Sequence, residues 1–319
     1  MSNPASARFN RAVADILADT SAAPWRLHAP RHWAPYLLVL PSVIVLVGVM
    51  IYPIAYGVYL SLFEYRMTQS LNWVFVGLGN YRRLFLQTPE FLNSIYVTFQ
   101  FTLLTITAEF VVGLSLALLL NMDFPLRTLF RTLVLLPLMV PPLVSGLLWR
   151  VMYDNQFGVI SFFIRALGFE PPVFLGDRLL ALPSVVATEV WRATPFMTLV
   201  LLAALQAVPH EIHEAAQVDG AGRMSRFRFI SLPLILPVLL VALLFRTVDV
   251  LRTFDLVYLL TQGGPGSRTE VIGMYIYRVG FVNFNMGITS ALAMLLFLLT
   301  LIVCVVYLRL VVRGQALTR

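Results

Sequence analysis

The chain has 319 residues, of which 59% are hydrophobic and only 12% are charged, and its formal net charge is +7 at pH 7. An average soluble domain carries about 25% charged residues, so this composition excludes a water-soluble globular protein and indicates a chain that crosses a membrane several times. The single cysteine, Cys304, excludes an internal disulfide, and all 23 basic residues are arginine.

Six apolar stretches are each long enough to cross a hydrocarbon core of about 30 Å as a helix that rises about 1.5 Å per residue. The predicted fold class is therefore all-α, with six transmembrane helices in one membrane domain, residues 36–319. Residues 1–35 are polar and rich in alanine and are expected to form a cytosolic N-terminal arm. The six predicted spans are 36–63, 92–121, 129–152, 179–208, 232–250 and 286–307.

An even number of spans places both termini on the same side of the membrane. With both termini, the segment 209–231, and Arg127 and Arg131 near the start of the third span assigned to the cytosol, twelve arginines lie on the cytosolic side and nine on the other. Cytosolic loops of membrane proteins are enriched in arginine, so this small bias agrees with cytoplasmic termini.

Prolines interrupt two of the predicted spans. Pro137, Pro141 and Pro142 fall in the third span and Pro195 in the fourth. Because proline removes a backbone donor and kinks a helix, we expect these positions to be the bending points of the membrane domain.

Ionisable side chains at mid-bilayer cost about 2.5 to 3.5 kcal/mol each, so they normally face the bundle interior and have a partner. Three arginines have an acid three residues away, a spacing that places both groups on one face of a helix. Each pair either neutralises itself or lines a site that hydrogen-bonds a hydroxylated solute. We expect neutralisation for the third pair, at the membrane edge, whereas Glu109 has no local partner. The pairs are Glu189 with Arg192, Arg246 with Asp249, and Arg252 with Asp255.

The segment between the fourth and fifth spans is short, charged and helical in pattern. Pro209 suits a first helical position, and Gly220 suits the left-handed residue that ends a helix. Ala215 and Ala216 leave one helix face nearly bare, so a partner could approach the backbone closely. Ser225 is expected to cap a second short helix. By spacing alone, an ordinary amphipathic loop explains the segment equally well.

The same segment carries a sequence signature. Glu214-Ala215-Ala216, then Asp219-Gly220-Ala221 and Ile230-x-Leu232-Pro233, closely resembles the EAA coupling loop of bacterial ABC importer permeases, the integral subunits that the ATPase engages. The resemblance implies a type I ABC importer permease fold with a cytosolic coupling helix. The residues it implies for ATPase coupling are Glu214, Ala215, Ala216, Val218, Asp219 and Gly220.

Most of residues 36–307 also resembles the carbohydrate branch of these permeases, which includes the maltose, trehalose and glycerol-3-phosphate importers. The resemblance rests on groups such as Leu148-Trp149-Arg150 and Gly263-Gly264-Pro265. It implies import of a sugar-like solute across the bacterial plasma (inner) membrane, with an extracytoplasmic solute-binding protein, a second homologous permease subunit in a heterodimer, and two ABC ATPase subunits. The maltose subunit has extra N-terminal spans and a large external domain that have no counterpart here.

The solute site implied by this family lies in the spans on either side of the coupling loop. Aromatic rings stack on sugars, and charged side chains hydrogen-bond their hydroxyls. Trp191 and Phe196 match the maltose subunit in character, whereas Arg246 and Asp249 do not, which implies a different solute. Arg192 is added because it belongs to one of the charge pairs. The predicted substrate-binding residues are Trp191, Arg192, Phe196, Arg246, Asp249, Val250 and Thr253.

Other functions fit the sequence less well. Residues 263–266 cannot form a Walker A loop, because that loop requires lysine and the chain has none; ATP and Mg²⁺ are expected only in the partner ATPase. A permease for glycerol-3-phosphate or another non-sugar solute is the main alternative. A self-contained secondary carrier is disfavoured because no inverted repeat is evident. The spacing of His210 and His213 disfavours a metal site, and no catalytic residue, bound cofactor or nucleic-acid partner is expected.

Overall fold

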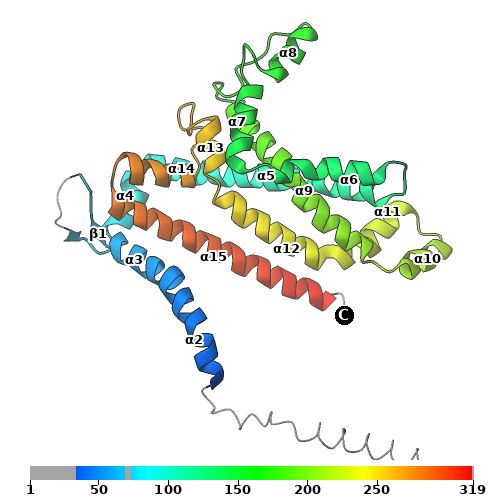
Figure 1. Cartoon of the computed structure of the whole chain (residues 1–319), viewed down its shortest axis with the longest axis horizontal. Coiled ribbons are helices and arrows are strands. Elements are labelled where there is room, and N and C mark those ends of the chain that lie inside the picture. The colour runs from blue at the N-terminus through cyan, green and yellow to red at the C-terminus, as the bar shows by residue number, and fades with distance from the viewer. Residues whose placement is uncertain (1–33, 69–72, 318–319) are drawn as a thin grey trace, which may run out of the picture. The chain divides into compact units, whose positions relative to one another are not determined.

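The computed structural model describes residues 34–68 and 73–317, most of which are helical (Figure 1). The predicted N-terminal arm, residues 1–35, lies outside the described residues apart from its last two positions. The described chain divides into two units between Tyr56 and Gly57. The first unit consists of α2 (Ala34–Leu46), a π-helical turn (Val47–Ile51) and the first half of α3 (Tyr52–Ser61).

The second unit contains the remaining helices and a two-stranded antiparallel sheet in which Phe63 pairs with Phe75. Buried Asn80 joins this sheet to the helix that follows it, since its Nδ2 donates to the carbonyl oxygens of Ser61 and Phe63, both at 2.8 Å. The elements are β1 (Phe63–Glu64), β2 (Val74–Phe75), α4 (Gly79–Gln87), α5 (Pro89–Asn121), α6 (Arg127–Leu135), α7 (Pro142–Met152), α8 (Val159–Ala166), α9 (Ala181–Gln206), α10 (His210–Val218), α11 (Arg223–Arg226), α12 (Leu232–Leu251), α13 (Asp255–Leu260), α14 (Ile272–Tyr277) and α15 (Met286–Leu317).

Five continuous helices among the described residues are long and apolar enough to cross a membrane, and a sixth stretch qualifies as a bent pair, in agreement with the six predicted spans. The fifth helix begins at Arg223 instead of residue 232, because α11, a π-helical turn (Phe227–Ser231) and α12 form one continuous run. Ser225 therefore lies inside a helix, and the predicted cap is wrong; Gly222 occupies the N-cap position. The five helices are Tyr36–Ser61, Pro89–Asn121, Ala181–Gln206, Arg223–Leu251 and Met286–Arg313.

The third predicted span is broken into two helices. Its first half, Arg127–Met139, and its second half, Pro142–Met152, are bent by 100° relative to each other. Pro137 lies in the 3₁₀ turn that ends the first half, and Pro142 is the first residue of α7. A proline lacks the amide hydrogen that would continue a helix but suits its first position, so these prolines end one helix and begin another. The predicted interruption of this span is confirmed.

Helix α9 continues through Pro195 without a break, unlike the third span, and the bending point predicted at Pro195 stays a prediction. Its packing against α5 accounts for this continuity. Gly113 of α5 lies so close to α9 that a Cβ at this position would be 2.8 Å from Met197 Cγ. Small residues allow membrane helices to approach in this way. Close packing on α5 thus offsets the hydrogen bond that the proline removes.

Two hydrophobic clusters fill the space among α5, α9 and α12. The first includes Phe101 of α5 and Val185 of α9, and the second includes Ala117 of α5 and Leu201 of α9. Between the two clusters each of these helices carries a buried charge, so a polar layer separates two apolar regions. The three charged residues are Glu109, Glu189 and Arg246, which are 0%, 1% and 4% exposed.

Candidate functional site

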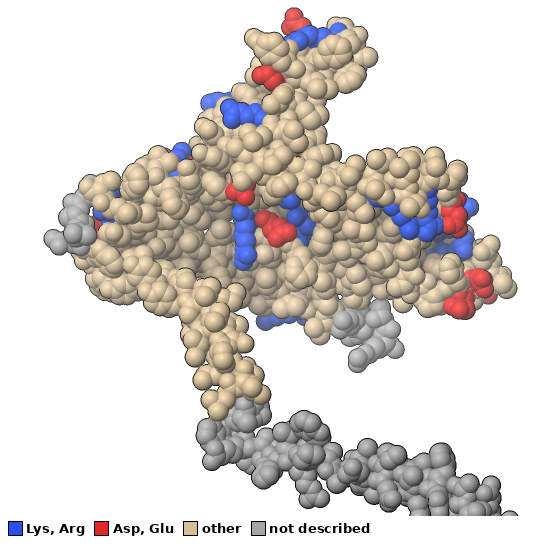
Figure 2. All heavy atoms as spheres, in the orientation of Figure 1, with Lys and Arg blue, Asp and Glu red and all other residues tan. Residues whose placement is uncertain are grey.

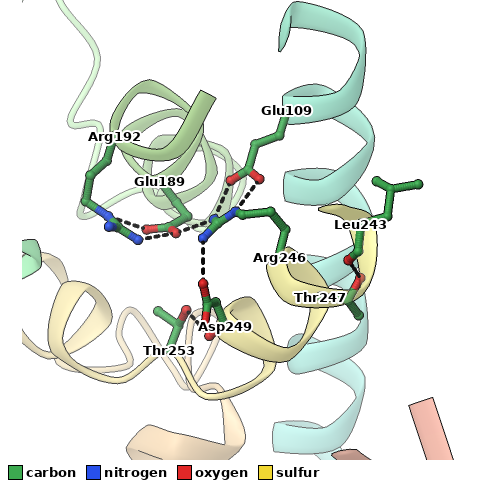
Figure 3. Close-up of polar contacts among 8 residues, drawn as sticks. All are labelled: Glu109, Glu189, Arg192, Leu243, Arg246, Thr247, Asp249 and Thr253. Atoms are coloured by element: carbon green, nitrogen blue, oxygen red, sulfur yellow. Dashed lines mark hydrogen bonds and ion pairs between the residues drawn. The ribbon is translucent and has the colours of Figure 1, made fainter. Parts of the chain in front are cut away.

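The three buried charges form one hydrogen-bonded network with Arg192 (Figure 3). Arg246 Nε donates to Glu109 Oε2 at 2.8 Å, and Arg246 Nη2 donates to Glu109 Oε1 at 2.7 Å, so the guanidinium holds this carboxylate with two bonds. The same Nη2 donates to Glu189 Oε1 at 2.8 Å. Arg192 donates to both oxygens of Glu189, at 3.1 and 2.6 Å. Charge-assisted bonds therefore tie α5, α9 and α12 together at one level.

The network reaches the surface at Asp249. Arg246 Nη1 donates to Asp249 Oδ2 at 3.3 Å, and the side chain of Asp249 is 67% exposed whereas that of Arg246 is 5% exposed. A buried charge is tolerated only when hydrogen-bonded partners surround it, and Arg246 has three carboxylates around it. Arg246 therefore orders the network, and Asp249 keeps most of its acceptor capacity for water or a solute.

A pocket of about 280 Å³ lies beside Asp249, where α9, the end of α12 and the start of α7 meet. Figure 2 shows acidic and basic side chains together midway along this unit, on a surface that is otherwise largely uncharged. Three carboxylates and two arginines line the pocket, which offers a solute both acceptors and donors. The polar lining consists of Glu189, Arg192, Asp249, Arg252, Thr253 and Asp255.

Arg252 and Asp255 line this pocket separately. In the described ranges they form no ion pair with each other, so the predicted neutralisation is wrong. The reason is that α12 ends at Leu251 with Arg252 as its C-cap, and a new helix, α13, begins at Asp255. The chain turns between the two residues, which removes the helical spacing. Asp255 instead lies in the first turn of α13, where the helix dipole favours a carboxylate.

The predicted substrate-binding residues are divided between the pocket, the interior and, for Trp191, a half-exposed position outside both. One group lines the pocket: Arg192, Asp249 and Thr253. Other members lie in the interior: Val250 is 1% exposed within the first hydrophobic cluster, Phe196 packs against the second, and the guanidinium of Arg246 is enclosed by carboxylates. Trp191 is 37% exposed and meets Trp149 edge to face, with ring centroids 5.5 Å apart.

Sequence reasoning did not identify the partner of Glu109. The structure provides it in Arg246, which lies 137 residues further along the chain on α12. The available signal was a mid-span acid without a local partner, together with a mid-span arginine in another helix. Spacing within one helix carries no information on such a contact, because helix packing brings these residues together.

Helix α10 lies at the end of this unit that also carries the α5–α6 connection, and none of its residues is buried (Figure 1). It begins at His210, with Pro209 one residue earlier as the N-cap. It ends with Gly220 in the left-handed conformation, φ +81°, and the amide of Ala221 donates to the carbonyl of Ala216 at 2.9 Å. This is the Schellman arrangement, so the prediction for Gly220 is confirmed.

The outward side of α10 forms an exposed stripe at helical spacing. On the other side, His213 faces a cavity, and Gln217 Oε1 accepts a hydrogen bond from Arg226 Nη1 at 3.3 Å. Ala216 is partly buried, whereas Asp219 and Gly220 are exposed. The stripe consists of Glu211, Glu214, Ala215 and Val218. Glu211 belongs to this stripe although the sequence motif did not include it. Val218, the most C-terminal member, is 89% exposed.

Short connections join α10 to both helices that line the pocket. Residues 207–209 link it to α9, and residues 219–222 link it to the continuous helix that contains α12. Further along, these two helices carry the pocket residues and are bonded to each other through Glu189 and Arg246. Short connections therefore link α10 to the two helices that carry the pocket residues.

At the opposite end, the Gly263-Gly264-Pro265 motif forms a tight turn. Thr269 Oγ1 donates to the carbonyl of Gly264 at 2.7 Å. The adjacent Glu270 has a side chain that is 3% exposed and pairs with Arg278 at 2.9 Å. Burial raises the pKa of the Glu270 carboxyl, and the charge of Arg278 opposes this shift. Buried polar contacts thus fix the turn.

Comparisons with known proteins agree with this architecture. The family model described as "binding-protein-dependent transport system inner membrane component" matches residues 109–313. The chain is 41% identical over 275 residues to the trehalose/maltose transport system permease protein MalF of Thermococcus litoralis, covering 86% of this chain and 92% of that protein. It is 38% identical to the sulfoquinovosyl glycerol transport system permease protein SmoG of Agrobacterium fabrum, covering 86% and 89%.

Solved structures give the same result for the fold. A chain of a bacterial ABC transporter involved in the import of the acidic polysaccharide alginate superposes with a TM-score of 0.76 at 25% identity, covering 89% of this chain and 96% of that one. A chain of the MetNI methionine ABC transporter superposes with a TM-score of 0.52 at 21% identity, covering 70% and 96%.

Proposed function

Because the chain belongs to the family of binding-protein-dependent transport system inner membrane components, we propose that it is the permease subunit of an ABC importer for a neutral carbohydrate. It is a transport subunit in a multi-pass membrane protein family. The names of the relatives, which include trehalose, maltose and sulfoquinovosyl glycerol systems, support a sugar-like solute. The last of these solutes carries a sulfonate, so the choice of a neutral solute rests on the charges of the pocket and not on these names. The absence of lysine from the sequence supports ATP hydrolysis in a separate chain, since a Walker A loop requires lysine.

One observation carries this proposal: the exposed helix α10 is connected directly to both helices that form the pocket. An ATPase that pushes or pulls the stripe Glu211, Glu214, Ala215 and Val218 would displace α9 and α12 together, because Arg246 and Glu189 bond them to each other. A displacement of α10 at one end of the unit would then change how accessible the pocket midway along the unit is to a solute. A self-contained carrier has no ATPase partner and therefore does not require an exposed helix for contact with one.

The proposal includes the assembly. The assembly has two ATPase subunits, which hold ATP and Mg²⁺, and one of them engages α10 in the cytosol, together with the other coupling residues, Ala216, Asp219 and Gly220. A second homologous permease subunit completes the membrane pathway as a heterodimer. An extracytoplasmic binding protein delivers the solute to the opposite end. Both termini and the arm formed by residues 1–35 lie in the cytoplasm, and residues 36–319 form the transmembrane domain in the plasma membrane.

The pocket also favours a class of solute. Glu189, Asp249 and Asp255 contribute three carboxylates, against two arginines, Arg192 and Arg252. This balance disfavours an anion such as glycerol-3-phosphate, and the alternation of donors and acceptors suits the hydroxyls of a neutral sugar. We assign solute contact to Arg192, Asp249 and Thr253, which line the pocket, whereas solute contact by Trp191, which does not line it, stays a prediction from the sequence. The interior contains three further predicted residues, which support the pocket residues without touching the solute: Arg246, Phe196 and Val250.

Reconstitution tests the proposal directly. The complete transporter in lipid vesicles should take up trehalose or maltose, presented with the binding protein, only when ATP is supplied to the ATPase. Uptake without ATP, driven by an ion gradient, would identify a secondary carrier instead. Transport of glycerol-3-phosphate in place of the neutral sugars would contradict the assignment of a neutral solute.

Replacing Asp249 with asparagine should raise the solute concentration needed for half-maximal uptake by about 10-fold, because a hydrogen bond to a charged group contributes about 1.5 to 3 kcal/mol. The Asp249 side chain is largely exposed, so the amount of assembled transporter should not change. The matched control is Glu170→Gln, an exposed acid in the α8–α9 connection. Equal half-maximal concentrations in the two variants would remove Asp249 from the solute site.

A further inference from the structure

Two adjoining cavities of different character lie at the end of the second unit that carries α10. The first, of about 210 Å³, is an apolar groove between α6 and α9, with Leu120, Val134, Leu135, Leu199 and Leu202 in its walls. The second, of about 370 Å³, is polar. Arg131 and Gln206 line both cavities, so the apolar groove continues into the polar cavity.

The polar cavity is strongly basic. Its walls include Arg127, Arg131, His210 and His213, and its one carboxylate, Asp123, is bonded to Arg127. A smaller cavity, which shares Asn121 and His213 with it, adds two further arginines, Arg223 and Arg226. Figure 2 shows both basic and acidic side chains at this end of the unit, and the acids on the outward stripe of α10 are not among the cavity walls. Four arginines thus surround the space, against a single acid.

The donors of this cavity are not all satisfied within the protein. Arg131 Nη2 donates to the carbonyl of Leu120 at 3.2 Å, but Arg131 Nε is buried and has no hydrogen-bond partner among the described residues. Arg226 Nε is in the same situation. A buried donor without a partner costs about 1 to 3 kcal/mol. Arg131 lines the groove and the polar cavity, and Arg226 lines the smaller cavity, so an anion bound in this space would lie next to the guanidinium groups of both residues.

We propose that the two cavities together bind one anionic phospholipid of the cytosolic leaflet, with its phosphate in the basic cavity and an acyl chain in the groove. The groove lies among membrane-spanning helices and the basic cavity at their ends, an arrangement that matches the two parts of a lipid. A free phosphate would use only the basic cavity and would leave the groove empty. The cytosolic location rests on the orientation given under the proposed function.

The position of this site gives the lipid a role in coupling. His210 and His213 belong to the inner side of α10, whose outer side is the stripe offered to the ATPase. A bound phosphate joins this inner side to Arg127 and Arg131 of α6. The lipid therefore steadies α10 against the bundle while its outer face is engaged.

Lipid retention by the purified transporter tests the basic half of the site. The complex is extracted from vesicles that contain equal amounts of phosphatidylglycerol and phosphatidylcholine, and native mass spectrometry should then show retained phosphatidylglycerol. Arg131→Gln should reduce this retention about 5-fold, because one arginine near an anionic lipid surface contributes about that factor. Arg228→Gln is the control, since Arg228 is an exposed arginine outside these cavities and lies over the ring of Phe229. This measurement does not involve transport, so its result stands whether or not the complex imports a sugar.

A second variant tests the groove without touching a charge. Leu199→Trp should fill the groove and reduce phosphatidylglycerol retention, whereas Leu298→Trp, at an exposed position on α15, should not. Unchanged retention in both Arg131→Gln and Leu199→Trp overturns the proposal. It is also overturned if inorganic phosphate raises the melting temperature of the complex as much as phosphatidylglycerol does, because the site would then be one for soluble phosphate.

Discussion

Replacing Arg246 with methionine is expected to lower the free energy of unfolding by about 3 to 5 kcal/mol, the usual cost of removing one partner from a buried ion pair. The Glu109 carboxylate is fully buried and receives two bonds from Arg246. Without Arg246 this carboxylate would remain in the bundle interior with no opposite charge next to it. Glu189 would keep its two bonds from Arg192, so most of the loss in the free energy of unfolding comes from the unpaired Glu109 carboxylate.

Unfolding of the purified chain in mixed micelles, titrated with SDS and followed by tryptophan fluorescence, measures this effect. Adding Glu109→Gln to Arg246→Met should recover more than half of the loss, because the amide carries no charge. Arg252→Met, six residues further along, is the control; Arg252 is exposed at the end of α12, and we expect a change within about 0.5 kcal/mol. If Arg246→Met proves as stable as this control, the network does not hold the three helices together.

Reversing the charge of Glu214 with Glu214→Arg should abolish most of the uptake, by about 10-fold or more, while leaving the folded protein intact. Glu214 is exposed in the outward stripe of α10, so its replacement removes no buried contact of this chain. If the ATPase surface complements Glu214 with a basic group, the arginine introduced here would repel it by several kcal/mol. We expect ATP hydrolysis in the assembled transporter to stop responding to the binding protein.

Uptake and ATP hydrolysis should be measured on the same vesicles, with Glu170→Arg as the matched charge reversal. Glu170 is also exposed but lies in the α8–α9 connection, remote in sequence from α10. An intact melting temperature with lost uptake separates uncoupling from misfolding. Normal uptake by Glu214→Arg would mean that this stripe does not carry the ATPase.

The elements that follow from local sequence pattern were predictable. Length and hydropathy located the five continuous spans to within a few residues, apart from the start of the fifth span and the end of the last, which runs to Arg313 instead of residue 307. The end of α10 was predictable because helices commonly end at a glycine in the left-handed conformation, as this one does at Gly220. The start of the fifth span was predicted nine residues too late. The charged residues after residue 223 lower the local hydropathy, so the pattern did not reveal that the helix is continuous from Arg223.

The features that depend on packing were not predictable. Helical spacing suggested that Arg252 and Asp255 pair, but the chain turns after Leu251 and separates them. The same rule paired Arg246 with Asp249, which is its weakest contact at 3.3 Å, and could not reveal the bonds to Glu109 at 2.7 and 2.8 Å. Pro137 and Pro195 look alike in the sequence, yet only the first belongs to a break, because α5 supports α9 along its length.

The break at Pro142 has a consequence for how water reaches the inside of the unit. A helix that begins part-way through a bilayer leaves several amide hydrogens in its first turn without acceptors inside the helix, which lipid cannot supply. Pro142 removes one of these hydrogens, and it also borders the pocket beside Asp249. In that turn the amide of Ser145 donates to the carbonyl of Pro141 at 2.9 Å, which within the described chain leaves the amides of Leu143 and Val144 to be satisfied by water that enters the unit.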